Sequence, residues 1–154
     1  MELLVVCAIM AFAACLPCWY VSFNTNVIAR ELHTLQSWLL AVQQKALLSG
    51  KDITISLDNK NLISDEDFFT FNEDVHFGVN AHTYGPPSSP TKRITDPISF
   101  NNHEMIFYHT GAMQVGTCYI VDKKGRIGAL TCGLSLHGTI RCYELQGKEW
   151  HLLA

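Results

Sequence analysis

The clearest hydrophobic pattern in this chain is at its start, where the first 23 residues are apolar except for a single charge at Glu2 and a few small polar positions. As a helix, such a run is long enough to cross a hydrocarbon core of roughly 30 Å. A carboxylate at the edge of a segment of this kind is costly and usually has a function. Residues 1–23 are therefore predicted to form the transmembrane or filament-core half of a helix.

The pattern becomes amphipathic between Val27 and Ser49. Residues recur at alternating spacings of four and three along one face: Ile28, Leu32, Leu35, Leu39, Val42, Ala46 and Ser49. This spacing predicts a helix with one buried face, and Gly50 stands where a helix commonly ends. Pro17 should kink the helix rather than end it. One helix of nearly fifty residues is expected, and its amphipathic half, residues 24–50, is expected to pack on a globular domain.

After Gly50 the apolar positions alternate over short runs, which is typical of strands. The expected strands are Ile53–Leu57, Val75–Val79, Ile98–Phe100, Met105–Tyr108, Gly116–Asp122, Arg126–Cys132, Thr139–Tyr143 and Trp150–Leu153. Lys123–Gly125 and Leu136–Gly138 predict hairpin turns. The predicted fold class is α+β, in which a long N-terminal helix packs on a small antiparallel β-sheet domain, residues 51–154.

Charge and targeting signals narrow the interpretation of the first segment. The net charge is −3, and no Lys or Arg precedes Arg30. A secretory signal peptide starts with basic residues, and a cleavage site near Ala11–Ala14 would fall inside the apolar run. A membrane anchor usually has a basic cytoplasmic flank. We therefore expect either that the chain is processed or that its natural start lies upstream of Met1.

Glu2-Leu-Leu-Val-Val6, followed by small and branched apolar residues and Pro17, resembles the start of a mature type IV pilin-like protein. The resemblance implies a pilin-like fold and a short basic leader that prepilin peptidase removes before N-methylation. It also implies that Glu2 pairs with the N-terminal amine of a neighbouring subunit and sets the register of assembly, since a buried charge is tolerated when it is paired. The residues implied for the filament-core helix are Leu3, Leu4, Val5, Val6 and Pro17.

A second resemblance lies near the other end of the chain. The segments Met105–Gly111, Gly116-Thr117, Lys124–Ile127 and Gly138–Arg141 are similar to the C-terminal pattern of the minor pseudopilin H family. That family implies a minor pseudopilin, which is a structural subunit of a type II secretion or type IV pilus-like filament. Its partners would be other pseudopilins or minor pilins. It would be anchored once in the bacterial inner membrane, with the globular domain in the periplasm.

The cysteines leave two interpretations open. If the second hairpin turns about His137, Cys132 and Cys142 lie opposite each other at a distance that a disulfide can span. A slip of one residue would place them on opposite faces. Cys118 is expected to remain a packed thiol, and so are Cys15 and Cys18, because their apolar segment contains no second ligand pair for a metal.

Basic residues suggest one candidate nucleic-acid contact. Lys123, Lys124 and Arg126 form a basic hairpin tip, with Arg141 on a neighbouring strand. Such a tip could contact DNA phosphates, although the net charge is −3 and Lys-Lys-Gly is also an ordinary solvated turn. DNA contact would point to a competence-type pseudopilin that contributes to DNA uptake.

No residue pattern predicts an enzyme, a cofactor or a metal site. The seven histidines form no His-x-x-x-His pair, and no nucleophile elbow or phosphate loop is present. The carboxylates of Asp65–Asp67 lack the alternating spacing of a calcium loop and are expected to form a solvated turn. A third hypothesis is a single-pass envelope protein with a β-rich binding domain and no role in a filament.

Overall fold

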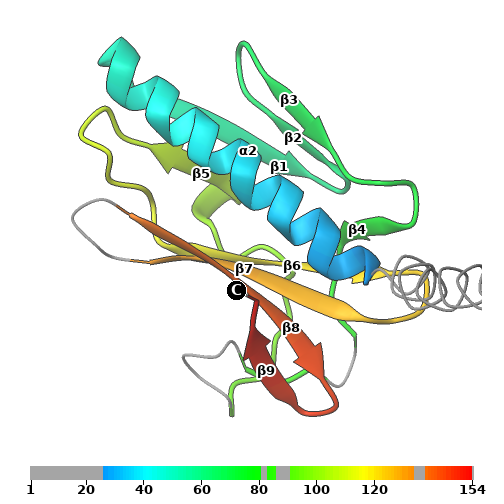
Figure 1. The fold of residues 1–154 in the computed structure, drawn as a ribbon. Coiled ribbons are helices and arrows are strands. Elements are labelled where there is room, and N and C mark those ends of the chain that lie inside the picture. Colours follow the sequence, from blue (N-terminus) through cyan, green and yellow to red (C-terminus); the bar gives the residue numbers. More distant parts are fainter. Residues whose placement is uncertain (1–25, 81–82, 86–90, 134–137, 154) are drawn as a thin grey trace, which may run out of the picture.

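The computed structural model describes residues 26–80, 83–85, 91–133 and 138–153. Within these described residues, helix α2 (Val27–Ser49) comes first and is followed by nine strands. Figure 1 shows the helix lying across the strands. The predicted segment 1–23, with Glu2 and Pro17, lies outside the described residues. Within the described part of the chain, no helix has both the length and the apolar character that crossing a membrane requires.

The strands form two antiparallel sheets. The four-stranded sheet has the order β3-β2-β1-β5 and the five-stranded sheet the order β4-β6-β7-β8-β9. The strands of the first are β1 (Ile53–Asp58), β2 (Asn61–Ile63), β3 (Phe68–Thr70) and β5 (Glu104–Phe107), which follows the 3₁₀ turn η1 (Asn101–His103). Those of the second are β4 (Val75–Phe77), β6 (Gly116–Asp122), β7 (Ile127–Gly133), β8 (Thr139–Gln146) and β9 (Glu149–Leu152).

The predicted fold class is wrong. We expected a long helix on one small sheet, whereas the described residues form a helix of 23 residues and nine strands in two sheets. The prediction missed β2 and β3, because strands of three residues are too short to show an alternating pattern. It also missed the division into two sheets, which arises because β1 pairs with β5. The expected strand at Ile98–Phe100 forms an isolated bridge from Ile98 to Cys118.

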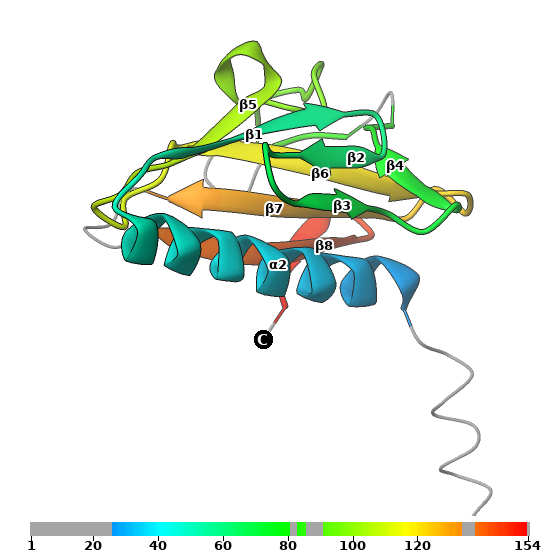
Figure 2. The same cartoon turned by 90° about the horizontal axis from the view of Figure 1, so that it is seen from above.

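The amphipathic face of α2 is confirmed. The fully buried positions follow the predicted spacing: Ile28, Leu32, Leu35, Leu39 and Ala46. Val42 is also buried, while Ser49 is exposed. Gly50 ends the helix in the left-handed conformation, with φ 63°. The buried face packs mainly on β6, β7 and β8 and touches β5, and Figure 2 shows the helix running along one side of β7 and β8.

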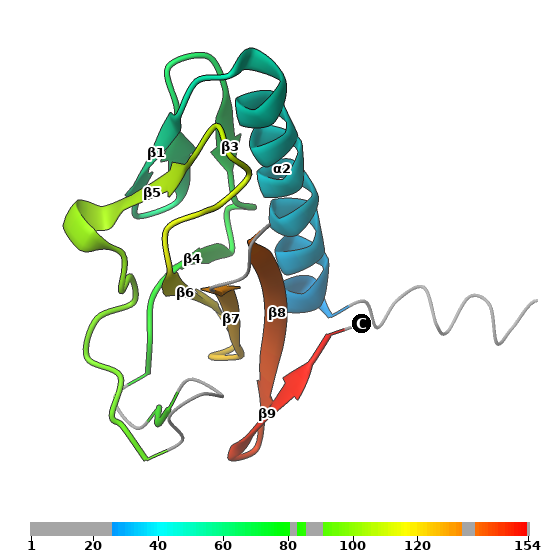
Figure 3. The ribbon, with the colours of Figure 1, turned by 90° about the vertical axis from the view of Figure 1, so that its left-hand side faces the viewer.

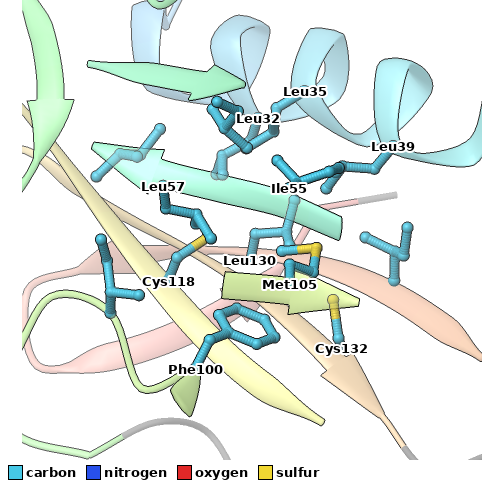
Figure 4. Close-up of a cluster of buried hydrophobic side chains, with 14 of the residues drawn as sticks. Leu32, Leu35, Leu39, Ile55, Leu57, Phe100, Met105, Cys118, Leu130 and Cys132 are labelled. Carbon is cyan, nitrogen blue, oxygen red and sulfur yellow. The ribbon is translucent and has the colours of Figure 1, made fainter. Parts of the chain in front are cut away.

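One hydrophobic core joins the helix to both sheets. Figure 4 shows the meeting side chains, with Leu35 and Leu39 from α2, Ile55 and Met105 from the four-stranded sheet, and Leu130 and Cys132 from the five-stranded sheet. An aromatic row closes this core at the β3 side. The distance between ring centroids is 5.6 Å for Trp38 and Phe69, 5.3 Å for Phe69 and Phe71, and 5.1 Å for Phe71 and Phe77.

The outer face of the five-stranded sheet has a smaller cluster of its own. Ile94, Tyr119 and Ala129 are buried there, and Tyr143 and Trp150 pack against them. Figure 3 shows the β8–β9 hairpin projecting from the end of this sheet, far from β1, β3 and β5. The cluster covers part of the outer face and leaves the adjoining part, around Thr117, Thr131 and Arg141, open.

Candidate functional site

The predicted turn at Lys123–Gly125 is confirmed and joins β6 to β7. Val121 lies opposite Ile127, and Gly125 takes a φ of 77°, which favours glycine. The side chain of Asp122 fixes this turn. Its Oδ1 accepts hydrogen bonds from the backbone nitrogens of Lys124 and Arg126, both at 2.9 Å, and its Oδ2 accepts one from Arg126 Nε at 2.7 Å.

The four predicted DNA-contacting cations do not form one patch. Lys123 pairs with Asp74, and Arg126 Nη2 lies 2.7 Å from Asp122 Oδ2. Lys124 has no ion pair with any described residue. Arg141 lies on β8 opposite Thr131, five residues along the sheet from the position of Arg126. Two of the three charges at the hairpin tip are therefore neutralised by carboxylates of the same domain.

Of the two interpretations of Cys132 and Cys142, the one with a disulfide is not observed, because the register differs from a turn centred on His137. Cys132 lies opposite Ile140 and Cys142 opposite Leu130, so the two thiols are diagonal neighbours. Such neighbours lie roughly 7–8 Å apart, beyond the reach of an unstrained disulfide. Cys118, Cys132 and Cys142 are all free and buried, and the Cys142 thiol donates to the backbone oxygen of Leu32 at 3.6 Å.

These three thiols should be inert while the domain is folded. Burial raises the pKa of Cys132 and of Cys142 to about 12, with the nearby Cys142 contributing to the shift at Cys132, and it raises that of Cys118 well above its ordinary value. Reactivity requires the thiolate and access to it. We expect iodoacetamide at pH 8 to leave all three unlabelled in the native full chain and to label them after denaturation, as read by peptide mass spectrometry. Labelling of Cys132 in the native chain would contradict the observed packing.

The acidic turn at Asp65–Asp67 is exposed to solvent, as predicted, and it also contacts the helix. Lys45 Nζ lies 2.7 Å from both Glu66 Oε2 and Asp67 Oδ2. These hydrogen bonds, with that of Asp67 the strongest, raise the pKa of Lys45. In the described ranges, no group of three or more His, Cys, Asp or Glu side chains is arranged to hold a metal ion. These exposed ion pairs connect the last part of α2 to the β2–β3 turn and each contributes little to stability.

The helix presents an outward face that the sequence prediction passed over. Between His33 and Gln44 the chain has no Asp, Glu, Lys or Arg. The exposed fractions of Leu40, Leu47 and Leu48 are 43%, 48% and 90%. The hydroxyls of Thr34 and Ser37 donate to backbone oxygens four residues earlier, both at 2.9 Å. The lack of charge could have been found in the sequence, whereas the internal hydrogen bonds could not.

The start of α2 is fixed to the β domain by two long-range contacts. The side-chain amide of Asn26 donates to Glu144, a carboxylate of β8 that is 6% exposed. Glu31 accepts a hydrogen bond from the backbone nitrogen of Asn72 at 3.3 Å. Both contacts join residues far apart in the chain, so no local signal could have predicted them. They set the direction in which the chain enters the domain.

Comparison with known proteins finds no matching family model, no matching curated protein and no matching solved structure.

Proposed function

We propose that this chain is a minor pseudopilin, a structural subunit of a type II secretion or type IV pilus-like filament. The observation that carries the proposal is the outward face of α2 between His33 and Gln44, an exposed stretch of helix without charged residues in a chain that also has an apolar segment, residues 1–23, with Glu2 near its start. A helix that stays in water normally carries charged and polar residues on its outer face. A face with exposed leucines among small polar residues and without charges can be buried against other helices at a smaller desolvation cost than a charged face.

The geometry supports different roles for the two faces of α2. One face of α2 holds the β domain through its fully buried residues, while the outward face is available for neighbouring subunits. Thr34 and Ser37 add little cost to burial, because their hydroxyls are already hydrogen-bonded to the helix backbone. In this proposal residues 1–23 hold the subunit in the inner membrane before assembly and enter the helix bundle afterwards, with Glu2 setting the register.

A charge on the outward face should block assembly without unfolding the domain. We expect Leu40→Glu to prevent incorporation of the full chain into filaments in the source cell, because a buried unpaired carboxylate is strongly unfavourable. The measurement is the amount of chain in sheared filament fractions against the amount in the membrane fraction. Ile63→Glu is the matched control, because Ile63 on β2 is similarly exposed, at 50% against 43% for Leu40, and should leave incorporation unchanged.

Two outcomes separate the proposal from its alternatives. Normal incorporation of Leu40→Glu would remove the support that the outward face provides. Mass spectrometry of the chain expressed with its upstream codons should find an N-methylated Phe a few residues before Glu2, whereas a cut near Ala14 would favour a secreted β domain. The competence-type alternative has less support, because Lys123 and Arg126 are paired with carboxylates.

A further inference from the structure

The open part of the outer face of the five-stranded sheet is hollowed into a groove. The groove has a volume of about 530 Å³. Its floor crosses three strands, with Thr117 of β6 opposite Thr131 of β7 and Thr131 opposite Arg141 of β8. Ser99, Thr139 and Tyr143 add further hydroxyls to the lining. We call this surface the Arg141 groove.

Among the residues that the structure describes, Arg141 is the single charged residue that lines this hollow. It has no ion pair with any residue in the described ranges, in contrast to Arg126 and Lys123. Its own backbone oxygen accepts a hydrogen bond from the hydroxyl of Thr131 at 3.5 Å. A guanidinium offers five N–H donors in a planar fork that fits a carboxylate with two parallel hydrogen bonds. The groove thus places an available carboxylate-binding group among hydroxyl donors.

The groove continues into a second hollow of about 200 Å³, with which it shares Ser99 and Thr117. The second lining adds the cations Lys92 and Arg93 and one carboxylate, Asp96. The Oδ1 atom of Asp96 is already occupied, since it accepts a hydrogen bond from the backbone nitrogen of Ile98 at 2.9 Å. Among the described residues, the joined lining holds three cations, of which Arg93 already has an interaction of its own, and one carboxylate, in a chain whose net charge is −3.

We propose that the Arg141 groove binds an acidic peptide segment of a partner protein, with a carboxylate on Arg141 and a further acidic residue toward Lys92. Charge complementarity favours an anion. The aromatic side chains favour peptide over single-stranded nucleic acid, which needs open rings for base stacking. Tyr119 is 3% exposed and packs on Trp150 at 5.9 Å between ring centroids, and Tyr143 is itself half-buried.

The test is binding of fluorescein-labelled hexaglutamate to the full chain in detergent micelles, followed by fluorescence anisotropy. We expect Arg141→Gln to weaken binding roughly tenfold or more, the size expected for loss of a charge-assisted hydrogen-bonded pair. Lys148→Gln is the matched control, because it removes one exposed cation from the β8–β9 turn and should change the affinity less than twofold. Arg141→Lys, which retains the charge but lacks the fork, should fall between the two.

Three results would overturn the proposal. They are no binding of hexaglutamate by the folded wild-type chain, an equal loss in Arg141→Gln and Lys148→Gln, and tighter binding of a labelled twelve-residue oligothymidine than of hexaglutamate. The last result would identify the groove as a nucleic-acid surface. Thr117→Val gives a second variant in case Arg141→Gln does not fold, and it should also weaken binding, because Thr117 lines both hollows. The binding assay needs no filament. Its failure would therefore leave the pseudopilin proposal standing, and failure of the filament experiments would leave the peptide-binding proposal standing.

Discussion

Replacing Gly128 with valine is expected to lower the free energy of unfolding by about 3 kcal/mol, at the upper end of the usual cost of overpacking a core. Gly128 lies on β7 directly beneath the first turns of α2. A Cβ atom at this position would stand 2.6 Å from both Ile28 Cγ2 and Leu32 Cδ1, closer than side-chain atoms can approach. Because Val is favoured in strands, the loss would reflect displacement of the helix and not poor strand propensity.

The measurement is denaturant unfolding of the full chain in detergent micelles, followed by circular dichroism. Thr131→Val is the matched control, since it places the same side chain on the opposite face of the same strand, and it should shift the free energy by less than about 0.5 kcal/mol. Shortening the opposing side chain should restore part of the loss, so that Gly128→Val combined with Leu32→Ala is more stable than the sum of the two single effects. Strict additivity would show that the helix does not rest on Gly128.

The sequence predicted correctly those features that depend on the residues of a single element. The spacing from Ile28 to Ala46 predicted the buried face of α2, because a helix repeats every 3.6 residues whatever it packs against. The turn at Lys123–Gly125 was equally local. Gly128 shows the limit of such signals, since it looks like an ordinary small residue in a strand and its role is set by α2, about a hundred residues earlier in the chain.

The errors arose where pairing between distant segments decides the outcome. One of the two interpretations placed Cys132 opposite Cys142, but the hairpin pairs Gly133 with Thr139, which shifts the two thiols to diagonal positions. The basic tip was predicted from neighbouring residues, while its neutralisation by Asp74 depends on β4 lying beside β6. Arg141 was grouped with the tip on sequence alone, and the register of β7 and β8 moved it to a separate groove.

Replacing Asp122 with alanine should destabilise the domain by about 2 kcal/mol at pH 7, within the range for the loss of hydrogen bonds to a charged group. The side chain of Asp122 is 4% exposed, against 35% for Arg126. Its removal would leave two backbone N–H groups and the guanidinium without their acceptor. Asp74→Ala is the matched control, because it breaks an ion pair of the same hairpin whose partners are 52% and 70% exposed, and such pairs contribute about 0–1 kcal/mol.

The effect of Asp122 should depend on pH in a direction that its environment fixes. Burial raises the pKa of Asp122, but the hydrogen bonds from Arg126 and Lys124 and the charge of Arg126 outweigh that effect, so the pKa lies below its ordinary value. The ionised carboxylate therefore stabilises the fold fully above the unfolded-state pKa of about 4, and this stabilisation is lost as the pH falls through the lower folded-state pKa. Melting curves of wild type and Asp122→Ala should differ most near pH 7 and converge toward pH 2.5. A difference that stays constant over this range would mean that Asp122 acts through its shape and neutral hydrogen bonds, and not through its charge on Arg126.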